Sequence, residues 1–194
     1  MENARKLYAS LYSAELTVTD KGTGTVTQEL TFCYDQNDTL SYSYFGTDGN
    51  TKYYEYHNGS EYNYYSDGEW HTLVSGDQNY VSYNRTNKMS MTDEGMIFIK
   101  PDCVTGSEVK ETADGKTVTM QYDVSKLNDS MSAQLGLVGD LDSFSVVYNL
   151  DRDGYCTSME QIGYATKDGA QGKVDYLMTI THMNDVAAVE KPEV

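Results

Sequence analysis

Short turn signals recur at a regular interval in the first half of this 194-residue chain. The dipeptides Asp48-Gly49, Asn58-Gly59 and Asp67-Gly68 stand nine or ten residues apart. Asn-Gly and Asp-Gly favour two-residue hairpin turns, because the central positions of these turns need a positive φ. Between the turns lie runs of six to eight residues that are rich in aromatic and β-branched residues, which is typical of strands. The spacing therefore predicts a β-meander.

Tyrosine takes the place of aliphatic residues in these strands. The chain has 18 tyrosines, while leucine, isoleucine, valine and phenylalanine together number 35, and the formal charge is −16. Few aliphatic residues with a high net charge often mark a disordered chain. Position argues against disorder, since Leu40, Tyr42 and Tyr44 alternate with serines at the period of a half-buried strand. Tyrosine buries a large apolar ring and keeps a polar tip, so it can build a core.

The strand pattern returns in the second half. Val118–Tyr122 and Val174–Ile180 again alternate, and Asp114-Gly115, Asp153-Gly154 and Asp168-Gly169 supply further turns. Leu127, Met131, Leu135 and Val138 recur at helical spacing, which predicts a helix over 125–138, and residues 4–12 form a weaker helix candidate. A short strand is expected at 96–99.

These elements predict a mainly β (α+β) protein of ten or eleven antiparallel strands in sequence order. The expected fold is one large, curved meander sheet, a half-barrel, with one to three helices packed in its concave face. Residues 1–194 would form a single domain, which is the usual outcome at this length. No βαβ alternation occurs, so a parallel sheet is not expected. A closed barrel and a two-sheet sandwich are the alternatives.

Motifs that carry catalysis are missing from the sequence. His57, His71 and His182 lie far apart without an HExxH pattern, and neither a GxSxG elbow nor a glycine-rich phosphate loop is present. Cys33, Cys103 and Cys156 form no CxxC pair, which leaves one disulfide or three free thiols open. We therefore expect no enzyme, no cofactor and no metal.

The segment Asp151-Arg152-Asp153-Gly154 has a weak likeness to a calcium loop. An EF-hand loop carries glycine at its sixth position and glutamate at its twelfth. Here the glycine comes directly after the second aspartate, and the twelfth position is Ile162. A hairpin turn is the better interpretation of this segment.

Charge and the N-terminal sequence bear on the surroundings of the protein. A formal charge of −16 without a basic run disfavours nucleic acid and anionic lipid surfaces as partners. No stretch reaches the roughly 18 apolar residues of a membrane helix. Residues 1–5 lack the apolar region of a signal peptide, so the protein is either cytosolic or a mature domain whose signal lies outside this chain. The polar, acidic composition favours the extracytoplasmic alternative.

Aromatic and methionine side chains are the candidate ligand-binding groups. Neighbouring strands bring many of them toward one sheet face, and methionine suits irregular cavities. They are Tyr42, Tyr44, Tyr54, Tyr56, Tyr62, Tyr64, Trp70, Met120 and Met131. They form either a filled core or the lining of a concave ligand site. A third interpretation is a saccharide or peptide platform, for which Tyr53 and Tyr65 would face the opposite side.

Two segments resemble a known family. The successive tyrosine hairpins of Tyr53–Trp70 and the ending Ile180–Val186 followed by Pro192 are similar to the lipoprotein-carrier-like group, which includes mycobacterial lipid-binding lipoproteins and Gram-positive surface lipoproteins. The resemblance implies an unclosed half-barrel with helices in a hydrophobic cavity. It also implies anchoring outside the cell, at the surface or in the periplasm, through an N-terminal lipidated cysteine that is missing from this chain.

We therefore expect a monomeric, non-enzymatic lipoprotein domain that binds an apolar or amphipathic small molecule or lipid in a Tyr/Met-lined concavity. It would touch the membrane only through the lipid anchor. The alternative is a cell-surface module that binds glycan or protein and has a filled core.

Overall fold

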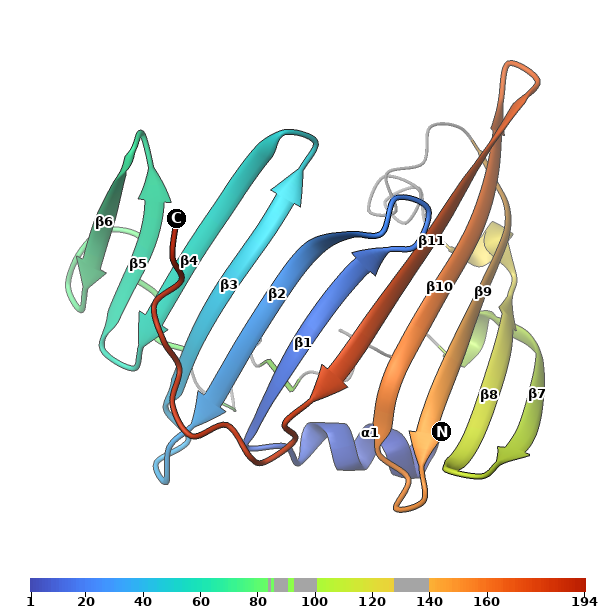
Figure 1. The fold of residues 1–194 in the computed structure, drawn as a ribbon, viewed down its shortest axis with the longest axis horizontal. Coiled ribbons are helices and arrows are strands. Elements are labelled where there is room, and N and C mark those ends of the chain that lie inside the picture. Colours follow the sequence, from blue (N-terminus) through green and yellow to red (C-terminus); the bar gives the residue numbers. More distant parts are fainter. Residues whose placement is uncertain (84, 86–90, 93–100, 128–139) are drawn as a thin grey trace. The chain divides into compact units, whose positions relative to one another are not determined.

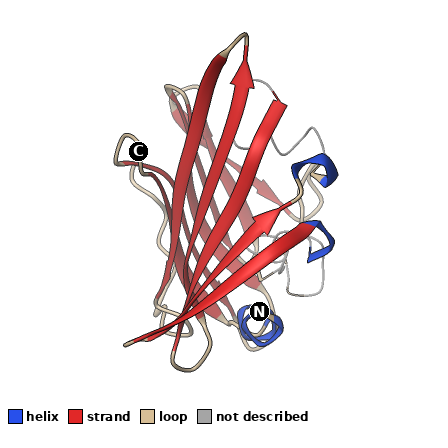
Figure 2. Cartoon of the chain, turned by 90° about the vertical axis from the view of Figure 1, so that its right-hand side faces the viewer, coloured by secondary structure: helices blue, strands red, loops and turns tan. Residues whose placement is uncertain are grey.

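The computed structural model describes residues 1–83, 85, 91–92, 101–127 and 140–194. The prediction of a mainly β fold is confirmed, since eleven antiparallel strands form one sheet that is not closed (Figure 1). Figure 2 shows how little of the described chain is helical. The strands are β1 (Ser13–Asp20), β2 (Thr25–Tyr34), β3 (Leu40–Asp48), β4 (Thr51–Asn58), β5 (Glu61–Ser66), β6 (Glu69–Val74), β7 (Val104–Thr112), β8 (Gly115–Tyr122), β9 (Asp140–Asp151), β10 (Cys156–Lys167) and β11 (Ala170–Thr181).

The order of the strands differs from a simple meander. Along the sheet they run β6-β5-β4-β3-β2-β1-β11-β10-β9-β8-β7, so the first strand lies beside the last. The edge strands β6 and β7 follow each other in the sequence. Residues 75–103 separate these two strands. A connection of this length is not a two-residue hairpin turn of the kind that joins β3 to β4. The sheet thus consists of two meanders that join through β1 and β11.

Helical structure is short. The α-helix α1 (Glu2–Ala9) buries Ala4 and Tyr8, which lie one turn apart on one face. The 3₁₀ turns are η2 (Pro101–Cys103) and η3 (Val124–Lys126). The helix predicted over 125–138 overlaps η3 only at its start, and η3 is capped by Asp123. Residues 128–139, with Met131, and the strand expected at 96–99 lie outside the described residues. No helix in the described part of the chain is long and apolar enough to cross a membrane.

The first of two compact units comprises Met1–Tyr8, Thr19–Thr25 and Glu94–Thr179. The predicted common face of Val118, Met120 and Tyr122 is confirmed, because these residues pair with Tyr148, Val146 and Phe144 of β9. The face continues to Met159, which pairs with Tyr148. Val118, Tyr122, Phe144, Val146, Tyr148 and Met159 are all buried on it. The helix α1 contacts the turn after β9, since a Cβ added to Gly154 would lie 3.2 Å from Asn3 Nδ2.

The second unit comprises Ala9–Val18, Val26–Asp93 and Ile180–Val194. Its largest fully buried side chains include those of Phe32, Leu40, Tyr42 and His57. Leu40, Tyr42 and His57 belong to the hairpin of β3 and β4. This region therefore has an ordered core, although the composition of the chain resembles that of disordered proteins. All three cysteines are free. The sequence left open either one disulfide or three free thiols, and the structure has three free thiols.

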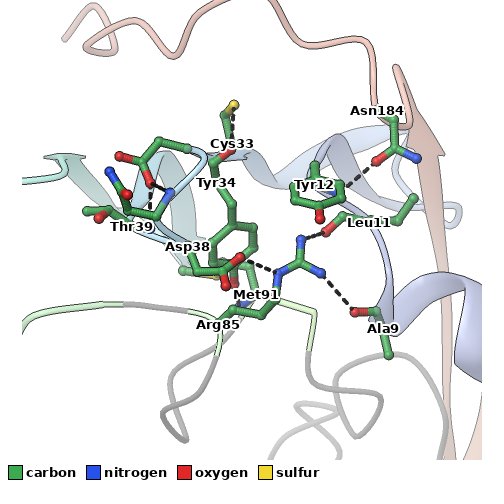
Figure 3. A network of polar contacts seen from close by, with 12 residues as sticks. Ala9, Leu11, Tyr12, Cys33, Tyr34, Asp38, Thr39, Arg85, Met91 and Asn184 are labelled. Atoms are coloured by element: carbon green, nitrogen blue, oxygen red, sulfur yellow. Dashed lines mark hydrogen bonds and ion pairs between the residues drawn. The ribbon is translucent and has the colours of Figure 1, made fainter.

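Arg85 ties three segments of the second unit together (Figure 3). Its guanidinium lies 4.4 Å from the ring centre of Tyr12 and 4.8 Å from that of Tyr34. The same group donates hydrogen bonds to the carbonyl oxygens of Ala9 and Leu11, and its Nε lies 3.3 Å from a carboxylate oxygen of Asp38. A planar cation with several donors can make these contacts at once, which a lysine ammonium cannot. The sequence offered no local signal for this contact, because Arg85 lies 74 residues from Leu11.

Candidate functional site

The hairpin turns between β3 and β6 decide which face of the sheet each tyrosine occupies. The three loops are Gly49-Asn50, Gly59-Ser60 and Asp67-Gly68. A two-residue loop joins position i to position i+3, so each even-numbered residue pairs with an odd-numbered one and shares its face. Accordingly Tyr42 pairs with His57, and His57 pairs with Tyr62. The side-chain face of even-numbered residues therefore alternates from strand to strand.

This alternation defines two faces of the second unit. The Tyr42 face carries Leu30, Phe32, Tyr34, Leu40, Tyr42, Tyr44, Tyr53, Glu55, His57, Tyr62, Tyr64, His71 and Leu73. The Trp70 face carries Phe45, Tyr54, Tyr56, Asn63, Tyr65, Trp70 and Thr72.

The expected common face of the candidate residues is therefore wrong for three of them. Tyr54, Tyr56 and Trp70 lie on the Trp70 face, opposite Tyr42, Tyr44, Tyr62 and Tyr64. The sequence does hold the signal that separates them, because counting even and odd positions across each two-residue turn gives the observed assignment. The same count places Tyr65 on the Trp70 face but Tyr53 on the Tyr42 face, where Tyr53 pairs with Gly46 and is 47% exposed.

The two candidate methionines do not join this group. Met120 belongs to β8 of the first unit, where it is half-buried and its sulfur lies 3.6 Å from the hydroxyl of Tyr122. Met131 lies outside the described residues.

The chain itself covers the Tyr42 face around His57. Tyr42 is 2% exposed, and His57 is completely buried. The ring of Tyr83 lies 5.3 Å from the ring centres of both, in an edge-to-face arrangement, and Tyr80 stacks on His57 at 6.3 Å. Tyr42 and His57 stack on each other at 5.9 Å. At this end of the face the tyrosines form a filled core.

His57 has an incomplete set of hydrogen bonds. Its Nδ1 lies 3.0 Å from the carbonyl oxygen of Leu40 and 3.0 Å from the backbone nitrogen of Gly59. Its buried Nε2 has no hydrogen-bond partner among the described residues. Burial lowers the pKa of His57, and the bond to Leu40 opposes this shift. The folded protein therefore favours the neutral ring.

Stability is expected to depend on pH through His57. Below about pH 6.5 the unfolded chain protonates this histidine while the folded chain does not, so the unfolded state binds more protons. The free energy of unfolding should therefore fall as the pH drops from about 6.5 toward the lower pKa of the folded state. Urea denaturation between pH 7.5 and 5.5 measures this fall.

His57→Phe is expected to flatten the pH dependence in that interval, because phenylalanine cannot titrate. His182→Gln is the matched control for the loss of a histidine, since the side chain of His182 is 56% exposed. An equal slope for His57→Phe and the wild type would contradict the assignment.

The other end of the Tyr42 face remains partly open. The rings of Tyr62 and Tyr64 stack at 5.8 Å, and Tyr64 stacks on His71 at 5.1 Å. Glu55 pairs with Tyr64, and its carboxylate accepts a hydrogen bond of 3.1 Å from the hydroxyl of Tyr42. Glu55, Tyr44, Tyr62, Tyr64 and His71 are half-buried, and we name them the Glu55 cluster.

The electrostatics of the Glu55 cluster follow from one carboxylate among phenol groups. Burial raises the pKa of Tyr62, and the neighbouring negative charge of Glu55 raises it further. The same two causes raise the pKa of Tyr44. These phenols stay protonated at neutral pH, so their hydroxyl groups can donate as well as accept hydrogen bonds. The cluster thus combines aromatic faces with one carboxylate acceptor.

Metal-binding groups and two of the thiols can be described for the residues that the structure covers. In the described ranges, no group of three or more His, Cys, Asp or Glu side chains is placed to hold a metal ion. The carboxylate of Asp151 accepts hydrogen bonds from the backbone nitrogens of Asp153 and Tyr155, as expected for a hairpin turn. Burial raises the pKa of the Cys156 thiol to about 12 and also raises that of Cys33, which disfavours the reactive thiolate form.

Comparisons with known proteins give a likeness of fold. No protein-family profile matches the sequence, and no curated protein matches it. The crystal structure of LprF from Mycobacterium bovis matches with a TM-score of 0.50 and 14% sequence identity, over 99% of this chain and 93% of that chain. At this identity the match shows a shared fold and no sequence family.

Proposed function

We propose that this chain is a monomeric, non-enzymatic domain of the cell envelope that binds an amphipathic small molecule or lipid at the Glu55 cluster. The observation that carries the proposal is the stacked set Tyr62, Tyr64 and His71, which continues the buried core but stays half-exposed beside a carboxylate. The shared fold with LprF agrees with the lipoprotein resemblance of the hairpins and supports an envelope protein.

The chemistry of the cluster restricts the ligand. The tyrosine rings favour an apolar chain or ring, and burial of that part supplies about 25 cal/mol per Å². A carboxylate can only accept hydrogen bonds, so the polar end of the ligand should donate them and be neutral or cationic. A fatty-acid carboxylate would face both Glu55 and the net charge of −16.

Native mass spectrometry with three twelve-carbon amphiphiles tests the proposal. We expect dodecylamine and monododecanoylglycerol to bind and dodecanoate to bind more weakly. Glu55→Gln should weaken dodecylamine about tenfold, which corresponds to about 1.4 kcal/mol, with less effect on the glycerol ester. Tyr62→Ala should weaken both ligands.

Tyr176→Ala is the matched control, because Tyr176 is also half-buried but belongs to β11 and lies outside the Glu55 cluster. A preparation that shows only the ligand-free mass and takes up none of the three amphiphiles would contradict the proposal. Equal uptake by wild type and Tyr62→Ala would place the ligand elsewhere.

The same proposal puts the domain outside the cytoplasmic membrane, held there by a lipidated cysteine upstream of this chain. The likeness to LprF and the tyrosine hairpins support it. The coding sequence upstream of residue 1 in the gene tests this part of the proposal directly. A signal peptide that ends in a lipobox cysteine supports the localisation, and a cytosolic start contradicts it.

A second candidate function is a surface interaction module, and the aromatic side chains of the Trp70 face favour it. A glycan array and a pull-down with Tyr65→Ala and Tyr54→Ala, two variants of the Trp70 face, separate the two functions. Loss of glycan or protein binding in these variants supports the interaction module. Retained binding favours the first function, amphiphile binding at the Glu55 cluster.

A further inference from the structure

A row of four aromatic rings crosses the Trp70 face. Phe45, Tyr54, Tyr65 and Trp70 come one each from β3, β4, β5 and β6. Successive ring centres are 5.3, 6.1 and 5.6 Å apart, so the rings touch in an unbroken line. All four side chains are half-buried, and the row runs across the strands over about 14 Å, which is three strand spacings. We name it the aromatic row.

The C-terminal segment of the same unit has a regular burial pattern of its own. Between residues 183 and 194, only Met183, Val186, Val189 and Pro192 are half-buried, and the residues between them are exposed. These four apolar positions recur at every third residue. A period of three is that of an extended polyproline II chain, and it is neither that of a strand nor that of an α-helix. Residues 185–194 have no helix or strand assigned to them.

Two contacts locate this segment on the sheet. The backbone nitrogen of Val186 donates a hydrogen bond of 3.1 Å to the hydroxyl of Ser13. Farther along, the ammonium of Lys191 lies 4.1 Å above the ring centre of Trp70, at the end of the aromatic row. In Figure 1 the segment (red) leaves β11 and runs toward β4 and β5, where the chain ends. The segment is thus attached at Ser13 of β1 and at Trp70 of β6, where a lysine covers the indole.

The segment is held loosely compared with a strand. Within the described part of the protein, the hydrogen bond of Val186 and the cation–π contact of Lys191 are the specific polar contacts of residues 186–194. No ladder of backbone hydrogen bonds joins it to a neighbouring strand. A segment with so few directed bonds can be displaced by a competitor of the same pattern.

We propose that the aromatic row is a docking surface for a basic, extended segment of another polypeptide, with an apolar side chain at every third position and a lysine or arginine over Trp70. The C-terminal segment is the internal occupant that such a partner displaces. Its own pattern shows which chain conformation fits, and the net charge of −16 favours a basic competitor over residues 186–194, where Glu190 and Glu193 flank Lys191. Extended chains of this period dock on aromatic surfaces at a low entropic cost. The surface lies opposite the Glu55 cluster, so the inference stands without the proposed ligand.

The single tryptophan of the chain is part of the surface and reports on its occupation. The probe is a peptide with the sequence of residues 183–194 in which Glu190 and Glu193 are replaced by lysine. A second peptide of the same composition places its apolar residues at every second position. We expect a saturable change of the Trp70 fluorescence of the 194-residue chain with the first peptide, at an affinity at least about tenfold higher than with the second.

Loosening the internal segment should make the surface more available. The Val189→Asp variant of the 194-residue chain is expected to bind the first peptide about five- to tenfold more tightly than the wild type. Trp70→Ala removes the fluorescent residue, so its peptide binding is measured by calorimetry. This variant should no longer bind the peptide but should still bind dodecylamine, which distinguishes the two sites. Tyr176→Ala should bind as the wild type does.

Equal affinity for the two peptides would overturn the proposal, and so would unchanged affinity in Val189→Asp. If Val189→Asp binds no peptide but the wild type forms concentration-dependent dimers that the first peptide dissociates, the occupant is a second copy of this chain and the proposed foreign partner is wrong.

Discussion

Tyr42→Ala is expected to lower the free energy of unfolding by about 3–5 kcal/mol, as large aromatic truncations in protein cores do. Tyr42 is 2% exposed and contacts the rings of His57 and Tyr83, so its removal leaves a cavity that neither neighbour can fill without moving. It also takes the hydroxyl group away from Glu55. Urea denaturation followed by circular dichroism measures the loss.

Two variants separate core packing from other effects at this face. Tyr42→Phe keeps the ring and loses only the hydrogen bond to Glu55, so we expect a cost of about 1 kcal/mol. Tyr53→Ala removes a tyrosine that is 47% exposed and should change stability by less than about 0.5 kcal/mol. A loss for Tyr42→Ala no larger than that of Tyr53→Ala would mean that the residues after β6 do not close the face over Tyr42.

Gly115→Ala is expected to cost about 3–5 kcal/mol, which combines backbone strain with a steric clash. Gly115 begins β8 with a φ of +148°, and a Cβ at this position would lie 2.6 Å from the carbonyl carbon of Asp151 and 2.8 Å from its Cα. These atoms belong to the backbone of β9 and cannot turn aside as the end of a side chain can. The pairing of β8 with β9 would have to open locally.

Gly24→Ala is the matched control for the clash. Gly24 also has a positive φ, +73°, but a Cβ there meets nothing within 4 Å. We expect it to cost about 1 kcal/mol from strain alone. Thermal unfolding of both variants measures the difference, and equal losses would show that the approach of β9 to Gly115 contributes nothing.

Prediction from the sequence succeeded where the physical rule is local. The turns at Asp67-Gly68 and Asp168-Gly169 have positive φ at both central residues, as their composition indicated. The common face of Val118, Met120 and Tyr122 follows from the period of two and is confirmed. The error about Tyr54, Tyr56 and Trp70 was avoidable, because the lengths of the turns already assign their face.

The extent of the candidate site was less predictable, because it depends on which other residues of the chain cover the Tyr42 face. Tyr42 and Tyr62 occupy the same face and both lie beside Glu55, yet one is buried and the other half-exposed. The difference comes from Tyr80 and Tyr83, whose rings pack over one end of the face. These residues sit in an irregular segment without periodicity, so no pattern could show where they would lie.

By itself, the sequence determined the strands, their turns and the two faces of each hairpin, because these depend on residues within about ten positions of one another. The tertiary structure alone decided three things: the central place of β1 and β11, the position of Arg85 between Tyr12 and Tyr34, and the contact of Lys191 with Trp70. Each of them joins segments that are tens of residues apart. Such contacts depend on the whole set of packed side chains, and for these no periodic signal exists in the local sequence.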